Sequence, residues 1–556
     1  MPVYKTPGVY VEEINTLPPS VAEVATAVPA FIGYTELGPA ETADPKVVRI
    51  TTLLDFKTSF GGAQGLKFTV AAPAQPGQAP VVQAVPPTSA FSLHHAVNHY
   101  FKNGGGPCYV VSVGNYRSAP TKVRFSSGLL ALEKEDEPTL LVLTDAAALL
   151  APGAYYELCG EALAQCAKLG DRFTVMDVHG GDIQALRNDS NLLAGNLKYG
   201  AAYHPYLLTT LACPYADTDV AITRPNGGAA SNLTGSISFG APNGIVVSFT
   251  GVAGSNPGVT LAFGAEATTV SFTVAAASLT INDVSGKTGN DVLAAWVAFK
   301  AANNPTGGFD VARGGDGTGA PATANVARTA IPLPPPVGES LATIQTSETA
   351  LYNAVRSALE SQRLVLPPSA AVAGIYARVD REQGVWKAPA NVGVVAVLGP
   401  VAKITDDDQD RLNEDPTAGK SINAIRAFTG KGTLVWGART LAGNDNEWRY
   451  VSVRRLFITI EESARKATAF AVFEPNDAGT WLKVKAMIES YLYGLWERGA
   501  LAGAKPEAAY FVRVGLGTTM TAQDVLEGRM IVEIGIAAVR PAEFIVLRFS
   551  HKLQTE

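Results

Sequence analysis

The chain has 556 residues. At roughly 100 to 200 residues per domain, this length predicts three to five domains, or fewer with a large insertion. Its net charge of −6 provides no broad basic face for a phosphate backbone, so nucleic acid is not expected as a direct partner. Charged residues make up only 17% of the chain and hydrophobic residues 47%, which favours a subunit covered by neighbouring subunits.

The cysteines and the hydropathy pattern bear on where the protein is made. Cys108, Cys159, Cys166 and Cys213 form no CxxC pair and are too sparse to staple a chain of this size, so they are interpreted as reduced core thiols. The N-terminus lacks a basic region followed by an apolar one, and no apolar run reaches the roughly 18 residues of a membrane span. We therefore expect cytoplasmic synthesis and neither secretion nor membrane insertion.

The first half of the chain predicts an extended arm followed by an α/β body. The arm, residues 1–27, contains a strand-like run from Val9 to Ile14 bounded by prolines. The body, residues 28–215, alternates strands and helices around a low-complexity loop at 71–87. Its expected strands are 30–34, 108–113, 139–144 and 173–178, and its expected helices are 92–102 and 155–168.

An inserted β-rich module is expected at residues 216–340. Between Arg224 and Asp283 the only charged residue is Glu266, and short strands are predicted at 236–239, 244–249, 259–263 and 269–281. A helix near 291–302 is expected to close the module, and the prolines at 332–336 are typical of a stiff linker.

Alternation of helices and strands resumes at 341–540, the C-terminal part of the body. Helices are predicted at 346–363, 460–473 and 481–498, followed by a strand at 531–539. A last strand at 543–549 lies in a C-terminal arm, residues 541–556, and is apolar on both faces, so it needs cover on both sides.

Three motifs that resemble binding sites are weak. Gly419-Lys420-Ser421 has Glu414 where a phosphate loop needs glycine, and no cofactor is expected there. His95 and His99 share a helix face but have no evident third metal ligand. The run Asp406–Asp410 lacks the glycine and glutamate of a calcium loop and is interpreted as a solvated acidic turn.

The most enzyme-like feature lies at strand ends. Asp145 and Asp177 each stand near the end of an apolar strand, where α/β sheets place catalytic carboxylates, and His179 follows closely. Aspartates at strand ends also form turns and helix caps, and no nucleophile elbow accompanies them, so a structural role is favoured over a catalytic one.

Several motifs in the C-terminal half resemble those of the contractile tail sheath protein family. They include Pro367-Pro-Ser369-Ala-Ala-Val-Ala-Gly374, Gly384-Val-Trp386-Lys-Ala-Pro-Ala-Asn391, Val435-Trp-Gly-Ala-Arg439-Thr-Leu441, Tyr450-Val-Ser-Val-Arg454, Phe473-Glu-Pro-Asn476 and Pro541-Ala-Glu543-Phe544. The N-terminal Pro7-Gly-Val-Tyr-Val-Glu-Glu13 is similar to the family's opening segment. This order of motifs covers most of the chain except the β-rich module.

The resemblance implies a mixed α/β, multidomain sheath subunit with extended arms that add strands to neighbouring subunits. The candidate arm residues are Val9, Tyr10, Val11, Ile14, Phe544, Ile545, Val546, Leu547 and Phe549. Implied partners are other copies of the chain in stacked hexameric rings, an inner tube, a baseplate and a tail terminator. The assembly would contract without a cofactor, in a phage, a tailocin or an extracellular injection particle. Two alternatives stay open, an α/β enzyme using Asp145, Asp177 and His179, and a static tail ring.

Overall fold

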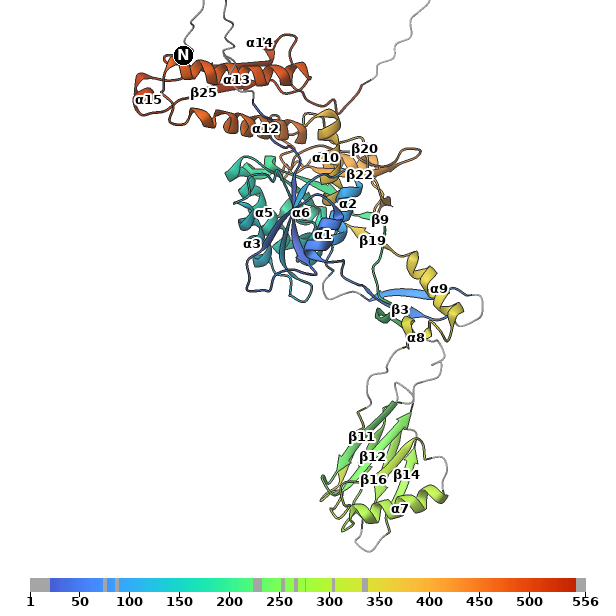
Figure 1. Cartoon of the computed structure of the whole chain (residues 1–556). Coiled ribbons are helices and arrows are strands. Elements are labelled where there is room, and N and C mark those ends of the chain that lie inside the picture. The colour runs from blue at the N-terminus through green and yellow to red at the C-terminus, as the bar shows by residue number, and fades with distance from the viewer. Residues whose placement is uncertain are drawn as a thin grey trace, which may run out of the picture. The chain divides into compact units, whose positions relative to one another are not determined.

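The computed structural model describes residues 21–73, 78–85, 90–223, 233–251, 256–264, 269–275, 277–302, 306–332 and 339–546. The chain divides into two compact units (Figure 1). The first contains residues 1–65, 86–214 and 360–556, and the second contains residues 66–85 and 215–359. The second unit therefore takes up one long insertion and one short earlier segment.

A nine-stranded sheet forms the centre of the first unit. Its strand order is β2-β5-β1-β6-β7-β8-β22-β23-β20. The six strands from β5 to β22 run parallel, whereas β2 and β23 are antiparallel to their neighbours. The strands are β1 (Pro29–Thr35), β2 (Lys46–Ile50), β5 (Cys108–Asn115), β6 (Leu140–Val142), β7 (Phe173–Asp177), β8 (Gly200–His204), β20 (Val392–Gly393), β22 (Ile422–Phe428) and β23 (Gly432–Val435).

Helices cover this sheet on both faces, because its parallel strands are connected by crossover segments. Successive residues of β1 alternate between the two cores, with Ile32 and Tyr34 in one and Phe31 in the other. The first core includes residues of α3 (Lys122–Leu132) and α5 (Pro152–Leu169), and the second includes residues of α2 (Leu93–Lys102) and α10 (Ser369–Gln383). Shorter helices are α1 (Leu53–Phe60), α4 (Thr144–Leu149), α6 (Ile183–Asn188) and α11 (Asp406–Asn413).

The C-terminal part of the first unit is a layer of helices with a small sheet. The helices are α12 (Val451–Ala467), α13 (Ala478–Glu497), α14 (Pro506–Ala509) and α15 (Ala522–Leu526), and the two-stranded sheet pairs β24 (Tyr510–Val514) with β25 (Val532–Ile536). Leu456 and Ile460 of α12 pack with Leu492 and Leu495 of α13. A further three-stranded sheet joins β19 (Arg363–Leu366), β9 (Leu207–Ala212) and β21 (Val397–Pro400).

The second unit begins with a four-stranded sheet. Its strands are β18 (Glu339–Ser340), β10 (Val220–Thr223), β3 (Lys67–Ala71) and β4 (Val81–Val85), and its helices are α8 (Leu341–Ile344) and α9 (Thr349–Glu360). β10 and β18 are antiparallel neighbours, with Ile222 opposite Glu339. The polypeptide therefore leaves and re-enters this sheet at adjacent points.

Between β10 and β18 lies a β-rich module with its own core. One sheet contains β11 (Leu233–Phe239), β12 (Ile245–Gly251) and β16 (Phe309–Arg313), and the other contains β14 (Ser271–Ala275), β15 (Ser278–Asn282), β13 (Gly258–Leu261) and β17 (Val326–Ala330). Helix α7 (Gly289–Ala302) contributes Val292 and Trp296 to the core. All the buried residues of this core come from residues 239–331.

The mixed α/β fold class is confirmed, and so are the strands and helices expected from 92 to 178. Four details differ. The loop expected at 71–87 contains β4, the strand expected at 269–281 is the hairpin β14–β15, and two further strands, β16 and β17, follow α7. The helix expected at 460–473 begins nine residues earlier, at Val451, and ends at Ala467.

Candidate functional site at the roots of the terminal arms

The described N-terminal segment begins at Val21 and is held against α12. Arg455 of α12 donates from Nη2 to the carbonyl oxygen of Thr26 at 2.8 Å and pairs with Asp380 of α10 at 2.5 Å. The Arg455 and Asp380 side chains are 3% and 5% exposed. The guanidinium of Arg455 also lies 4.6 Å from the centre of the Tyr376 ring. Arg455 is thus fixed from several sides, and it in turn fixes the point at which the N-terminal segment joins the body.

Two weaker contacts guide the same segment further outward. The backbone N–H of Val24 donates to Ser463 Oγ of α12 at 3.3 Å. Glu23 forms an ion pair with Arg498, which follows α13. The segment 21–26 therefore lies along the helical layer before the chain reaches residues 1–20, which contain Val9, Tyr10, Val11 and Ile14 and lie outside the described residues.

The C-terminal segment is attached to the body in a similar way, and we call the contacts that attach each terminal segment its root. Arg439 donates from Nε and Nη2 to the two carboxylate oxygens of Glu543 at 2.8 and 2.7 Å. Tyr450 donates from its hydroxyl to the same carboxylate at 3.3 Å, and the Arg439 side chain is only 4% exposed. A two-point contact of this kind fixes direction as well as distance. Glu543 is therefore the last point at which the body defines the path of the C-terminal segment.

Beyond Glu543, the chain presents apolar side chains to water. Phe544, Ile545 and Val546 are 73%, 80% and 77% exposed, and residues 541–546 belong to no strand or helix of this subunit. The strand expected at 543–549 is thus not formed by its described part, and Leu547 and Phe549 lie outside the described residues. Three adjacent exposed apolar side chains are typical of a surface that another element covers.

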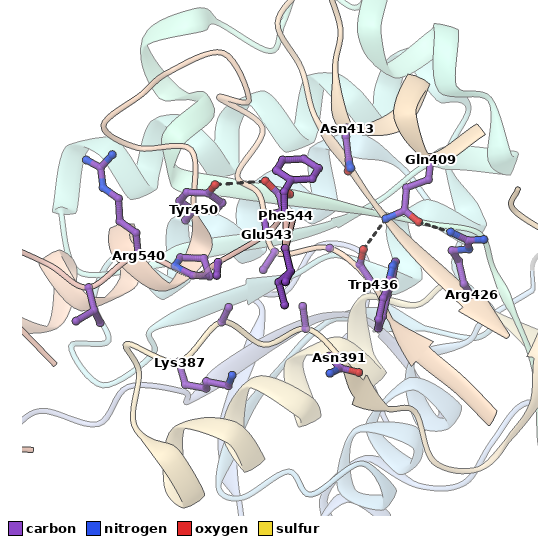
Figure 2. Close-up of a pocket in the computed structure, with 18 of the residues that line it drawn as sticks. Lys387, Asn391, Gln409, Asn413, Arg426, Trp436, Tyr450, Arg540, Glu543 and Phe544 are labelled. Atoms are coloured by element: carbon purple, nitrogen blue, oxygen red, sulfur yellow. Dashed lines mark hydrogen bonds between the residues drawn. The ribbon is translucent and has the colours of Figure 1, made fainter. Parts of the chain in front are cut away.

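A groove of about 990 Å3 lies beside this segment (Figure 2). We call it the arm groove. It is bordered by residues 539–545 themselves, and its other lining residues include Trp386, Asn391, Asp410, Arg426, Trp436 and Tyr450. In Figure 2, Phe544 lies next to Glu543 and Tyr450 in the upper part of the view, at the level of Gln409 and Asn413, whereas Lys387 and Asn391 lie in the lower part. The groove therefore offers half-buried tryptophans next to exposed apolar side chains.

The sheet β24–β25 has no third strand among the described residues. A two-stranded sheet with unpaired edges is a template for strand addition. The sequence pattern predicted β25 but not β24, nor the hairpin that they form. No motif marked this hairpin, because its significance depends on unpaired backbone groups rather than on side chains.

The strand-end aspartates hold helices in place. Asp145 is fully buried and accepts hydrogen bonds from the backbone N–H groups of Tyr34, Ser92 and Leu93, the last two at the start of α2. Asp177 accepts from the backbone N–H and the hydroxyl of Ser369 at the start of α10, at 2.7 and 2.5 Å. Burial raises the pKa of Asp145 to about 6 and that of Asp177 to about 7. His179, the third residue of the enzyme alternative, contacts the carbonyl oxygen of Leu150 through Nε2 at 2.8 Å.

The other candidate motifs also have structural surroundings. His94, His95 and His99 are all buried on α2, and His99 Nε2 lies 3.1 Å from the carbonyl oxygen of Val395. Lys420 is buried and donates to the carbonyl oxygens of Leu186, Arg187 and Asp189 around the end of α6.

The acidic run expected as a turn instead starts helix α11, with Thr405 as its N-cap. Among the described residues, no cluster of three or more histidine, cysteine or acidic side chains has metal-binding geometry. In the same residues, no helix combines the length and apolar character that a membrane span requires.

Comparison with known families gives two adjoining matches. Residues 291–441 match the phage tail sheath protein central domain, and residues 443–552 match the phage tail sheath C-terminal domain. The tail sheath protein of Vibrio phage KVP40 is 25% identical over 187 residues, which are 33% of this chain and 26% of that protein. The tail sheath protein of Burkholderia phage BcepMu is 32% identical over 154 residues, 27% of this chain and 32% of that protein. The matched stretch thus spans about a quarter to a third of these relatives' length.

Solved structures extend the similarity to the whole chain. A chain of the anti-feeding prophage baseplate is 27% identical, covers 99% of this chain and 100% of its own length, and superposes with a TM-score of 0.55. A chain of the sheath complex in the contracted state from PVC, an extracellular contractile injection system, is also 27% identical, with 99% coverage of both chains and a TM-score of 0.54.

Proposed function

Because the chain belongs to the contractile tail sheath family, we propose that it is the structural subunit of a contractile sheath. In this proposal, copies of the chain polymerise around an inner tube in an extended, metastable state and collapse into a shorter state that drives the tube through a target envelope. The energy is stored in subunit interfaces, and no cofactor or catalytic residue takes part. The enzyme alternative is disfavoured because Asp145 and Asp177 already accept hydrogen bonds from the helix starts that they hold.

The observation that carries this proposal is the contrast on either side of Glu543. Up to this residue, the chain is held by a two-point contact to the buried Arg439. After it, Phe544, Ile545 and Val546 are exposed and unpaired within the subunit. A segment with a fixed direction and exposed apolar side chains is suited to insertion into a neighbouring subunit. The open edges of the β24–β25 sheet could pair with such a segment from another copy.

The proposed partners are further copies of the chain in stacked hexameric rings, the inner tube, a baseplate and a terminator. The baseplate structure similar to this chain has sixfold symmetry, which supports a hexameric ring. Residues 1–27 and 541–556 act as inter-subunit arms in this proposal, and residues 28–215 and 341–540 form the sheath body. The β-rich module at 216–340 faces outward and decorates the sheath. Assembly takes place in the bacterial cytoplasm, and the product is part of a virion or of a released particle.

Electron microscopy of the overproduced protein tests this proposal. We expect hollow tubes or helical cylinders from the full chain, and folded subunits that do not polymerise after deletion of residues 1–15 or 542–556. A deletion within the β-rich module, which contains no arm residue, is the control. Discrete rings alone from the full chain would favour the static ring alternative. Normal tubes from the arm-deleted chains would contradict the role of the arms.

A further inference from the structure

We propose that the arm groove holds the C-terminal segment of its own subunit, residues 544–556, before the subunit joins a sheath. This regulatory use rests on the proposed sheath function, whereas docking of the segment in the groove can be measured without it. The groove and the segment are adjacent, since residues 539–545 already form one wall of the groove. The docked segment would shield its own apolar side chains and keep them from a neighbour.

The side chains on the two sides are chemically matched. Trp386 and Trp436 line the groove and are half-buried, whereas Phe544 and Ile545 at its border are 73% and 80% exposed. Moving these two side chains between the tryptophans removes apolar surface from water on both sides. The groove volume of about 990 Å3 lies at the upper end of the roughly 300 to 1,000 Å3 of ordinary ligand pockets, so it has room for several side chains.

Charge favours the same occupant. Asp406 and Asp410 line the groove on α11, and Asp406 is paired with Arg426 at 2.7 Å. Asp410 is exposed and forms no ion pair with the described residues. The segment beyond Val546 carries Arg548 and Lys552 and one acidic residue, Glu556, whereas residues 1–20 carry two acidic residues and a single lysine. A basic, apolar segment fits next to Asp410 better than the N-terminal arm of another copy does.

Tethering decides between the subunit's own segment and that of another copy. Glu543 is fixed to Arg439 and residues 544 and 545 line the groove, so the residues that follow are tethered to its border. A tether of a few residues gives a local concentration in the millimolar range. Free subunits at micromolar concentration compete poorly with this value. The subunit's own C-terminal segment therefore occupies the groove of a free subunit. It leaves the groove only when the end of a growing sheath presents several neighbouring subunits for it to bind.

Disulfide trapping in the full-length, unassembled chain tests the docking. The background variant is Cys213→Ser, because the other three cysteines are buried. In this background, Leu547→Cys is combined with Ala390→Cys, a groove position, or with Leu526→Cys, which is 82% exposed on α15. We expect the intramolecular disulfide to form at least about tenfold faster with the groove cysteine. Equal rates, or disulfides only between differently tagged copies, would overturn the proposal.

A charge variant gives a second readout that does not depend on polymerisation. Asp410→Asn removes the unpaired groove carboxylate, and Asp407→Asn is its matched control, because Asp407 is on the same helix and does not line the groove. We expect Asp410→Asn to speed the release of the C-terminal peptide by trypsin about two- to fivefold, and Asp407→Asn to leave it unchanged. Identical rates in both variants would contradict docking. If docking holds but no variant polymerises, the sheath function fails and the groove assignment stands.

Discussion

Three arginines between residues 439 and 455 are nearly excluded from water, and each has a partner that offsets this loss. Arg439 pairs with Glu543, and Arg455 pairs with Asp380. Arg454 lies 4.7 Å from the ring centre of Tyr199 and 4.6 Å from that of Trp448. Because a buried charge without a partner is strongly destabilising, these positions tolerate change poorly. Two of the three hold the root of an arm, which links the stability of the body to the direction of its arms.

Replacement of Glu543 measures the contact at the C-terminal root. Glu543→Ala leaves the guanidinium of Arg439, 4% exposed, without its carboxylate. We expect the free energy of unfolding to fall by about 2 kcal/mol, less than for a fully buried pair because Glu543 is 21% exposed. Chemical denaturation measures this change. The control is Glu533→Ala, which breaks the exposed pair with Arg513 and should cost less than about 1 kcal/mol. Equal losses in both variants would show that Glu543 anchors nothing.

Asp177 gives a prediction about pH. Burial raises its pKa to about 7 in the folded protein, against about 3.8 in an unfolded chain. Between pH 4 and 7 the folded state therefore binds the extra proton, and the contribution of Asp177 to stability falls as the pH rises, by up to about 1.4 kcal/mol per pH unit. Asp177→Asn removes this dependence, so the variant should gain stability relative to the wild type as the pH rises from 4 to 7.

The comparison with the variant is needed because other buried groups titrate in the same range. Burial lowers the pKa of His95 and His99 to about 4, so their contribution to stability rises with pH between about 4 and 6.5. Asp145, with its pKa near 6, acts in the same direction as Asp177. Subtracting the two denaturation curves at each pH cancels these shared terms. Parallel profiles for the wild type and Asp177→Asn would contradict the assignment.

At the scale of elements, the sequence predicts best where one residue type dominates a short segment. Four strands of the central sheet, β1, β5, β6 and β7, are nearly continuous apolar runs, such as Cys108–Val113, and they were located within one or two residues, whereas β2, β20, β22 and β23 were not predicted. Helix α12 was misplaced because twelve of its residues, including Arg454 and Arg455, are buried, which hides the usual alternation of apolar and polar faces. The hairpin β14–β15 was merged into one strand because its turn, around Ala277, lacks Gly, Pro, Asn and Asp.

The contacts at the arm roots could not be predicted from the sequence. The exposed apolar segment after Pro541 was identified from its pattern, but the contact that aims it joins Arg439 to a residue 104 positions later. No spacing rule connects such distant residues, since their proximity results from the packing of the whole unit. The same holds for the contact between Arg455 and Thr26, which are 429 positions apart.

Helix α12 is the element to which the N-terminal segment is attached. A substitution that removes a single hydrogen bond tests this attachment. Ser463→Ala removes the hydroxyl that accepts the hydrogen bond from the N–H of Val24. We expect faster hydrogen exchange of the Val24 amide, by a factor that corresponds to about 1 kcal/mol, with little change in overall stability. Ser490→Ala, at an exposed position of α13, is the control. Unchanged exchange at Val24 would mean that the segment is held by its other contacts alone.

At the scale of the whole molecule, the β-rich module is a candidate for independent folding. Its core contains only residues between 239 and 331, and none of them belongs to the cores of the first unit. The strands that precede and follow it, β10 and β18, are antiparallel neighbours. A chain that leaves and returns at adjacent points is typical of a domain insertion, which the surrounding fold tolerates because its strand pairing is preserved.

Excision of the module follows from this geometry. We expect a chain in which Asn-Gly replaces residues 223–338 to fold, because Ile222 and Glu339 are opposite each other in the β10–β18 pair, as the residues on either side of a two-residue hairpin turn must be. Its thermal transition should lie within about 4 °C of the corresponding transition of the full chain, and the transition of the module should disappear. Calorimetry measures both. The separate fragment 233–332 should fold alone, and the shortened chain should still form tubes if the module only decorates the sheath. A shortened chain that folds but does not polymerise would place the module within the subunit interfaces.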